Sequence, residues 1–339
     1  MVLGIESAWG QGRVRLLTLF LLVVLVVAGT VGYLQLAPYG PSSEIFITIP
    51  PGTRTPVVAT ELEKGGAIRS RYVFDLLRLV RGGKLLAGEY RFDHPVKMND
   101  VYNRLLRGDV YTLTLTIPEG YNIFDIARTV EMAKLGSKAD FLAAAKQHTE
   151  LITDLSPNAD SLEGFLFPDT YHFSRHTKPD QIVTAMVRRF RQQAAQAGLV
   201  TRVLPTVTLA SLVEKETSVD SERPLVAGVF QNRLLKGMPL ATDPTVIYAA
   251  LLDDRYRGAI YASDLQANSS YNTYKHVGLP PGPICNPGMA SLKAAINPAH
   301  TGYLYFVSDG NGHSKFSVTY DEHSAKVKDY RKTEEQMNR

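Results

Sequence analysis

The chain is almost without cysteine, since one residue of 339, Cys285, is of this type. A single cysteine excludes an intramolecular disulfide, and it neither requires nor excludes an oxidising compartment. A lone cysteine can also be a catalytic nucleophile. Cys285 lies in a loop rich in proline and glycine with no evident histidine base beside it, which favours a packing role.

Several familiar catalytic patterns are also missing. The sequence has no His-Glu-x-x-His helix, no Gly-x-Ser-x-Gly elbow, no Ser-x-x-Lys pair and no P-loop. Its eight histidines show no metal-ligand spacing, so we expect no metal and no cofactor. The net charge of +4 is weak and the basic residues are scattered, which argues against nucleic acid as a partner.

What is present is typical of a globular protein, with 45% apolar and 21% charged residues. The length suggests two or three domains. One segment departs from this composition: residues 16–36 form an almost unbroken apolar run without charge. A run of about 20 apolar residues is long enough to cross a bilayer as a helix.

The flanking charges predict how this helix would be oriented. Arg13 and Arg15 precede the run, so the positive-inside rule places residues 1–15 in the cytoplasm. The rest of the chain would then lie outside the cytoplasmic (inner) membrane, on its periplasmic side. The alternative is a cleaved signal peptide ending near Ala28, but the apolar run continues past that point, which favours a retained single-pass anchor.

Two segments beyond the anchor resemble each other. Ile47-Thr-Ile-Pro-Pro-Gly-Thr53 matches Leu115-Thr-Ile-Pro-Glu-Gly-Tyr121. Helices are predicted over 56–63 and 123–132, and β-like pieces follow at 88–92 and 169–173. This indicates a duplicated strand–helix–helix–strand unit, with modules over 44–114 and 115–175. Such a module resembles LysM domains, which implies binding of N-acetylglucosamine-containing glycans; a spacer that holds the next domain away from the membrane is the alternative.

From residue 178 the pattern becomes helical. Helices are predicted over 180–197, 205–217 and 225–235, and after Asp243-Pro244, where Asp243 reads as an N-cap and the proline as the first helical residue. Strand-like segments at 303–307 and 313–318 flank Ser-Asp-Gly-Asn-Gly, which predicts a hairpin.

The helix over 205–217 carries a misplaced acid. Leu209, Leu212, Val213 and Glu216 share one stripe at helical spacing, whereas Glu214 points elsewhere. A carboxyl group among leucines loses hydration, which raises its pKa and keeps it protonated as a general acid. The plainer reading is a glutamate paired with a cation or extended into water. Glu214 is the second candidate acid, with a solvated or salt-bridged role as its alternative.

A loop rich in proline, glycine and aromatics covers residues 271–288. Proline stiffens the backbone, which suits the wall of a cleft. Tyr271 and Tyr274 offer flat faces to sugar rings, and Asn272 and Asn286 offer donors and acceptors. A structural Ω-loop is the alternative.

Six motifs then follow in order along the chain. They are Leu212-Val-Glu-Lys-Glu-Thr217, Val229-Phe-Gln-Asn-Arg-Leu234, Thr242-Asp-Pro-Thr-Val-Ile-Tyr248, Tyr271-Asn-Thr-Tyr274, Gly278-Leu-Pro-Pro-Gly-Pro-Ile284 and Asn286-Pro-Gly288. Together they closely resemble the YceG-like (MltG) family of membrane-anchored endolytic murein transglycosylases. The match is strong from Leu209 to about Phe306 and loose before that.

The resemblance implies an α+β fold: a transmembrane helix, LysM-like subdomains, a catalytic domain over 176–330 and a tail over 331–339. It implies cleavage of peptidoglycan strands with Glu216 as the catalytic acid and 1,6-anhydro ends as products. It also suggests peptidoglycan synthases as partners. The residues proposed to bind substrate are Glu214, Asn232, Thr242, Asp243, Tyr248, Tyr271, Asn272, Tyr274 and Asn286.

Two other functions remain open at this point. A hydrolytic muramidase would need a second carboxylate, Asp243 or Asp220, to activate water or attack the sugar. A non-enzymatic anchored scaffold would instead use the LysM-like region to bind glycan.

Overall fold

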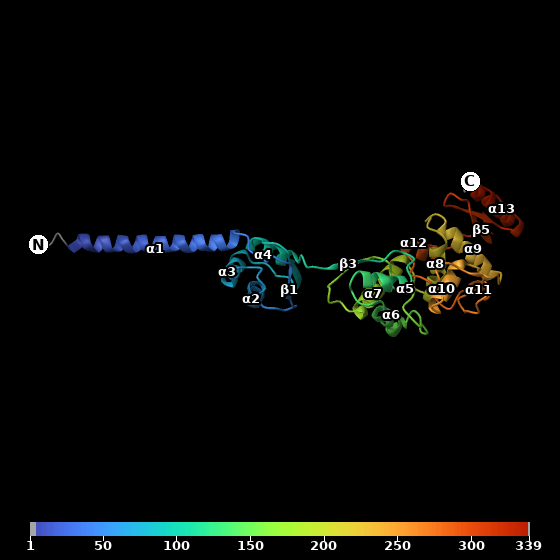
Figure 1. Ribbon diagram of the computed structural model, residues 1–339, viewed down its shortest axis with the longest axis horizontal. Helices are drawn as coiled ribbons and strands as arrows, with labels where there is room; N and C mark the ends of the chain where they lie inside the picture. The colour runs from blue at the N-terminus through green and yellow to red at the C-terminus, as the bar shows by residue number, and fades with distance from the viewer. Residues whose placement is uncertain (1–4, 338–339) are drawn as a thin grey trace. The chain divides into compact units, whose positions relative to one another are not determined.

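The computed structural model describes the backbone of residues 5–337 and the side chains of residues 13–332. Residues 1–4 of the predicted cytoplasmic segment and 338–339 of the predicted tail lie outside the described residues. The chain divides into two compact units, Met1–Thr112 and Leu113–Arg339, and each unit is described by itself (Figure 1).

Unit 1 begins with the long helix α1 (Ile5–Leu36). Its Arg13–Leu36 part is long and apolar enough to cross a membrane. At 1.5 Å per residue these 24 residues extend about 36 Å, more than the roughly 30 Å of a bilayer's hydrocarbon core. The predicted apolar run is therefore helical, and it forms the later part of a helix that begins at Ile5.

The rest of unit 1 follows the predicted strand–helix–helix–strand order. Its elements are β1 (Ile45–Ile49), α2 (Thr55–Lys64), α3 (Arg71–Arg81), β2 (Gly88–Phe92) and α4 (Met98–Arg107). Strands β1 and β2 pair antiparallel, with Ile47 opposite Tyr90. Both of these side chains are buried, together with Phe74 and Leu62 of the two helices.

Unit 2 opens with the second copy of this order. Its elements are β3 (Leu113–Thr116), α5 (Ile123–Met132), α6 (Lys138–Gln147), the 3₁₀ turn η1 (Thr149–Ile152) and β4 (Thr170–Phe173). Strands β3 and β4 pair antiparallel. The chain enters α5 through a capping box between Asn122 and Asp125, which satisfies free N–H groups of the first turn. The core of this copy is continuous with that of the helices that follow.

These helices place the candidate site. They are α7 (Pro179–Ala197), α8 (Val203–Glu216), α9 (Arg223–Leu235), α10 (Asp243–Leu252), α11 (Ala262–Leu265) and α12 (Met289–Ile296). Helix α8 is central, since it packs against α9, α10 and α12. Its residues Leu212 and Val213 have no exposed surface.

The C-terminal part consists of the predicted hairpin and a helix that the sequence analysis missed. Strands β5 (Tyr305–Ser308) and β6 (Ser314–Ser317) pair antiparallel. Helix α13 (Tyr320–Met337) packs on both strands. The segment predicted as a tail from 331 is therefore helical as far as Met337.

Candidate active site

Glu216 is the last residue of α8, and its surroundings favour the protonated form. Three leucine and valine residues on its stripe, Leu209, Leu212 and Val213, are buried, whereas Glu216 itself is half-buried. Burial raises the pKa of the Glu216 carboxyl, and the nearby charge of Asp243 acts in the same direction. The negative end of the α8 dipole lies at this residue and also disfavours a carboxylate.

Glu216 lines a pocket of about 290 Å³. The wall is built by α8, α9, the start of α10, the loop at Tyr274, the hairpin and α13. Its lining residues are Glu216, Phe230, Arg233, Leu240, Ala241, Thr242, Asp243, Pro244, Tyr274, Phe306 and His323. Of the ten predicted site residues, four meet here: Glu216, Thr242, Asp243 and Tyr274.

Thr242 positions the acid. Its hydroxyl donates a short hydrogen bond to Oε1 of Glu216, which leaves Oε2 as the oxygen free to carry the proton. Thr242 is itself held by Thr273, whose hydroxyl accepts from the Thr242 backbone N–H at 3.1 Å and lies 2.9 Å from the Thr245 hydroxyl. Thr242 is buried, so its hydroxyl contacts the catalytic candidate rather than being free for a sugar.

The structure corrects the predicted N-cap of α10. Thr242 is the N-cap residue and Asp243 is the first helical residue, followed by Pro244. Asp243 therefore does not cap the helix. Its carboxylate instead accepts a hydrogen bond of 2.7 Å from the Tyr274 hydroxyl. Partial burial and this acceptor raise the pKa of Tyr274, so the phenol stays protonated while its ring is 42% exposed toward solvent.

Among the pocket residues that were not predicted, two have titratable side chains, Arg233 and His323. Arg233 donates to the carbonyl oxygens of Leu304 and Leu240, at 2.7 Å each, and its charge acts on Glu216. Arg233 could have been predicted, because it belongs to the motif over residues 229–234. His323 lies on α13, outside all six motifs. Burial and the charge of Arg233 lower the pKa of His323, which favours the neutral ring.

Two asparagines that were predicted to bind substrate are buried and hydrogen-bonded within the protein. Asn272 and Asn286 have no exposed surface. Asn272 donates to the carbonyls of Leu265 and Ala267. Asn286 accepts from the Leu166 N–H and donates to Glu163 at 2.8 Å. Because their side-chain groups are already bonded within the protein, neither contacts a ligand in this conformation.

Three more predicted residues also lie away from the pocket wall. Asn232 donates to the backbone oxygens of Thr301 and Tyr303 and so fixes the approach to the hairpin. Tyr248 is buried, with its ring 5.1 Å from that of Tyr271. Tyr271 lines a different pocket, of about 100 Å³.

Glu214, the second acid of the motif, is a buried ion-pair partner. Its carboxylate lies 2.9 Å from Nη1 of Arg223 and accepts from the Gly288 N–H at 2.9 Å. Both charged side chains are about 95% buried. Arg223 also donates to Ser291 of α12, so this pair connects α8, α9 and α12 rather than facing a ligand.

A further buried acid, Glu163, had no sequence signal. It accepts from the Ile123 N–H at 2.9 Å, from Asn286 and from the Tyr248 hydroxyl. Burial raises its pKa to about 8 in spite of these hydrogen bonds. Glu163 thus joins the start of α5, α10 and the loop around Asn286.

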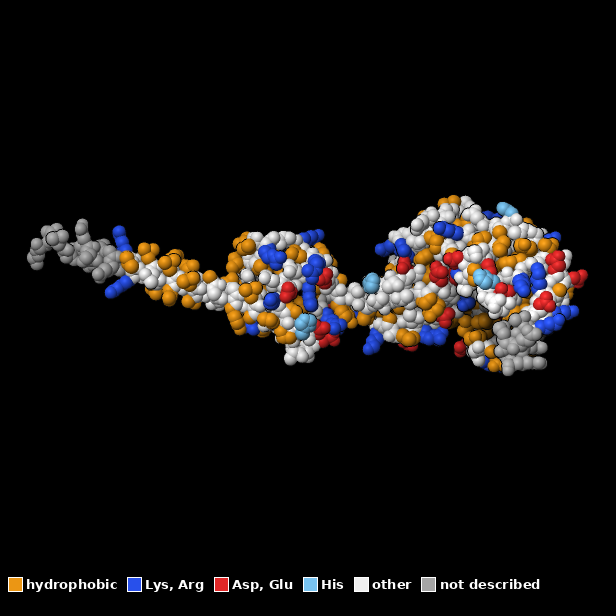
Figure 2. Space-filling view, turned by 90° about the horizontal axis from the view of Figure 1, so that it is seen from above, with side chains coloured by type: hydrophobic (Ala, Val, Ile, Leu, Met, Phe, Trp, Pro, Cys, Tyr) orange, Lys and Arg blue, Asp and Glu red, His pale blue; other side chains and the backbone are white. Residues whose placement is uncertain are grey.

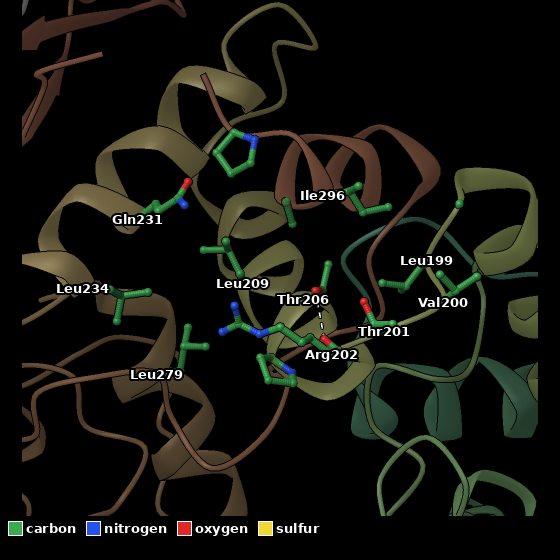
Figure 3. A pocket seen from close by; sticks show the side chains of 14 residues that line it. Leu199, Val200, Thr201, Arg202, Thr206, Leu209, Gln231, Leu234, Leu279 and Ile296 are labelled. Carbon is green, nitrogen blue, oxygen red and sulfur yellow. Dashed lines mark hydrogen bonds between the residues drawn. The ribbon is translucent and has the colours of Figure 1, made fainter. Parts of the chain in front are cut away.

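A second pocket, of about 320 Å³, shares α8 and α9 with the Glu216 pocket (Figure 3). Leu209, Gln231 and Leu234 line it, and the guanidinium of Arg202 extends into it. None of its lining residues is acidic, so it lacks a proton donor of the Glu216 type. Within the described part of the chain, no cluster of three or more histidine, cysteine or acidic residues is arranged to hold a metal ion.

Cys285 has the surroundings of a packing residue. It is fully buried and its thiol donates to the Ser211 carbonyl at 3.3 Å. Burial raises the pKa of the thiol well above its ordinary value, which suppresses the nucleophilic thiolate.

Comparisons with known proteins cover most of the chain. The YceG-like family matches residues 47–329. An endolytic murein transglycosylase of Bacillus subtilis is 33% identical over 305 residues, which are 84% of this chain and 84% of that relative. An endolytic murein transglycosylase of Streptococcus pneumoniae is 29% identical and covers 92% of this chain, which spans 64% of the relative.

A solved structure agrees with these matches. The crystal structure of a yceG-like protein from Listeria monocytogenes aligns with a TM-score of 0.55 and 31% identity, over 84% of this chain and 99% of the other. The family match runs from within β1 to within α13 and includes every residue of the Glu216 pocket. On this evidence the chain belongs to the YceG-like family.

Proposed function

We propose that this protein is an endolytic peptidoglycan transglycosylase that cleaves the β-1,4 bond between N-acetylmuramic acid and N-acetylglucosamine within glycan strands. One observation carries the proposal: a single half-buried carboxyl with a raised pKa, Glu216, opens on a pocket and is oriented by Thr242. The relatives named as endolytic murein transglycosylases supply the substrate class.

In the first half of the reaction Glu216 acts as a general acid. Its proton passes from Oε2 to the glycosidic oxygen, which leaves with the N-acetylglucosamine as the bond to C1 of the muramyl ring breaks. The carbonyl oxygen of the substrate's own acetamido group meets the positive charge that develops at C1. The raised pKa of Glu216 keeps this proton available at a higher pH than an exposed glutamate would.

In the second half Glu216 acts as a base. The carboxylate takes the proton of the C6 hydroxyl, and O6 attacks C1 and displaces the acetamido oxygen. This closes a 1,6-anhydro ring and returns Glu216 to its protonated state. Water is not consumed, so one carboxyl group is sufficient for the full cycle.

The test is product analysis on uncrosslinked glycan strands. We expect mass spectrometry to detect anhydromuramyl ends, one water lighter than reducing ends, and Glu216→Gln to abolish cleavage while glycan binding is kept. Wild-type protein that cleaves no strand under these conditions would instead leave the anchored glycan-binding scaffold as the function.

A hydrolytic muramidase is the second candidate, because Asp243 lines the same pocket as Glu216 and the two carboxyl groups interact. Asp220, the other acid considered, is 81% exposed and paired with Arg223, so it does not contribute to this pocket. A product pool made only of reducing ends would select the hydrolase.

We also propose that α1 anchors the protein in the cytoplasmic membrane, with the N-terminus inside, and with unit 2 and the part of unit 1 after α1 outside. Arg13 and Arg15 ahead of the apolar run favour this orientation. In this setting the strand–helix–helix–strand module of unit 1 is a LysM-like glycan-binding or spacer element. Peptidoglycan synthases at the same membrane are the expected partners, and failure of cross-linking to any such synthase would contradict that part.

A further inference from the structure

Helix α3 of unit 1 exposes a side that is apolar throughout. Tyr72, Leu76, Leu79 and Val80 are 70%, 43%, 82% and 77% exposed. They recur at helical spacing and therefore lie on one side. Soluble proteins rarely leave a contiguous stripe of this kind uncovered, and such a stripe marks a contact with another protein or with lipid.

The side of α3 that lies about 120° around the helix from the stripe is already used by the core of unit 1. Val73, Phe74 and Leu77 are buried there. At 100° per residue, Arg71 and Asp75 fall in the sector between the two apolar sides. The exposed stripe itself has no charged member, and the guanidinium of Arg71 stacks on Tyr72 at its N-terminal end, 4.8 Å from the ring centroid. Helix α3 thus has one apolar side for the protein core and a second one that the described residues do not cover.

Direct contacts fix this helix beside the end of α1. Arg69, two residues before α3, donates to the Tyr33 hydroxyl at 3.0 Å. Its guanidinium also lies 5.1 Å from the ring centroids of Tyr33 and Tyr39. Val31 and Leu34 of α1 pack against the core of unit 1. Helices α1 and α3 are also in contact.

The figures agree with this placement. Figure 1 places α3 on the side of unit 1 from which α1 emerges. In Figure 2 hydrophobic side chains gather along that same edge of the unit. If α1 crosses the bilayer, α3 therefore lies on the side of unit 1 that is nearest to that membrane.

We propose that α3 lies on the outer surface of the membrane that α1 spans, with its exposed apolar stripe at the boundary between headgroups and acyl chains. This inference rests on the proposed anchoring by α1. Apolar side chains of a surface helix enter this boundary, and tyrosines prefer it. Tyr33, Tyr39 and Tyr72 then form one interfacial group around the emerging helix, and unit 1 is held to the bilayer at a second point.

The experiment uses the full chain in vesicles of phosphatidylcholine and phosphatidylglycerol. Leu79→Cys places a thiol for an environment-sensitive fluorophore on the stripe, and the buried Cys285 serves as the unlabelled background in wild type. Val57→Cys on α2 is the matched control, because Val57 is also an exposed apolar residue, at 49%. Both residues are solvent-facing, so neither change removes core packing.

We expect the label at position 79 to be quenched several-fold more by acyl-chain bromines than the label at 57, and less by aqueous iodide. Equal iodide access at the two positions, or lipid quenching at both, would overturn the contact. Flotation of the vesicles provides the separate check on α1: protein that does not float with lipid is not anchored, which removes the basis of the inference while strand cleavage by Glu216 remains measurable.

Discussion

Two glutamates lie two positions apart on α8 and have opposite surroundings. Glu214 is neutralised by Arg223 and accepts a backbone N–H, whereas Glu216 has a threonine hydroxyl and a partly open pocket. A buried ion pair stabilises its charged partners, while burial without a bonded cation favours the neutral acid. Only Glu216 is therefore arranged to exchange a proton with a ligand.

Substitution by glutamine separates the two roles. Glu214→Gln leaves Arg223 buried without its main partner, and we expect a loss of roughly 3 kcal/mol in unfolding free energy. Glu216→Gln replaces an acid that has no cation bonded to it. We therefore expect a melting temperature near that of wild type and no cleavage. Thermal unfolding of both variants beside wild type measures this. A larger destabilisation by Glu216→Gln than by Glu214→Gln would contradict these assignments.

The hydrogen bond from Thr242 predicts a shift in the pH profile. That bond lowers the pKa of Glu216 by favouring its ionised form, against burial, which raises it. Thr242→Val removes the bond, so the pKa of Glu216 rises further. With Glu216 as the proposed acid, activity falls as pH rises through this pKa, and the alkaline limb of kcat/KM should move to higher pH in the variant.

The loss of rate in Thr242→Val at its pH optimum depends on how well the Glu216 carboxyl stays oriented. A catalytic carboxyl without its positioning hydrogen bond loses on the order of 10-fold in rate. Thr242→Ser keeps the hydroxyl and is the control, with an unshifted alkaline limb expected. A limb that stays in place in Thr242→Val would show that the hydroxyl does not act on Glu216.

At the scale of elements, Glu163 joins three segments that are far apart along the chain. It accepts from the first N–H of α5, from Tyr248 of α10 and from Asn286 of the loop. A charge in this position is costly to bury, and the carboxyl is protonated up to about pH 8. This junction of α5, α10 and the Asn286 loop is therefore neutral at acidic pH and charged at alkaline pH.

This predicts a pH-dependent stability. The pKa of Glu163 is raised from 4.5 when unfolded to about 8 when folded, so the native state binds more protons between these values. Its contribution to stability is full below about pH 4.5 and is lost as pH rises to about 8, with a slope of at most about 1.4 kcal/mol per pH unit. Glu163→Gln cannot ionise and should flatten this slope.

Urea unfolding at several pH values from 5 to 8 measures the difference between wild type and Glu163→Gln. We expect the variant to be less stable at pH 5, because its amide places an N–H₂ donor against either the Ile123 N–H or the Asn286 amide, both of which donate to Glu163. The difference in unfolding free energy should narrow toward pH 8. Asp160→Asn, at a nearby exposed carboxyl, should leave the wild-type slope in place. A constant gap across the range would mean that Glu163 does not titrate there.

Local signals predicted most elements and part of the site. The repeat at Ile47 and Leu115 gave both strand–helix–helix–strand segments, and the stripe ending at Glu216 gave α8 with the acid on its buried side. The sequence could not give Glu163, because its bond to Asn286 joins residues 123 positions apart. Nor could it tell that the Asn286 amide is already bonded inside the protein.

At the scale of the whole molecule, the candidate active site and the exposed apolar surfaces belong to different units. Every residue of the Glu216 pocket belongs to unit 2. The apolar run of α1 and the exposed stripe of α3 belong to unit 1. Each unit has its own cluster of buried residues, so the core of unit 2 is complete without residues of unit 1.

We therefore expect residues 113–339 alone to unfold cooperatively and to cleave soluble uncrosslinked strands. The fragment begins at β3, which pairs with β4 inside the same unit, so the cut leaves no strand of the fragment unpaired at its start. Its rate should stay within a few-fold of the full chain, with Glu216→Gln in the fragment as the inactive control. Calorimetry and strand digestion measure the two properties. A fragment that folds but cleaves nothing would mean that unit 1 contributes to substrate binding. The LysM-like module would then be a glycan-binding element rather than a spacer.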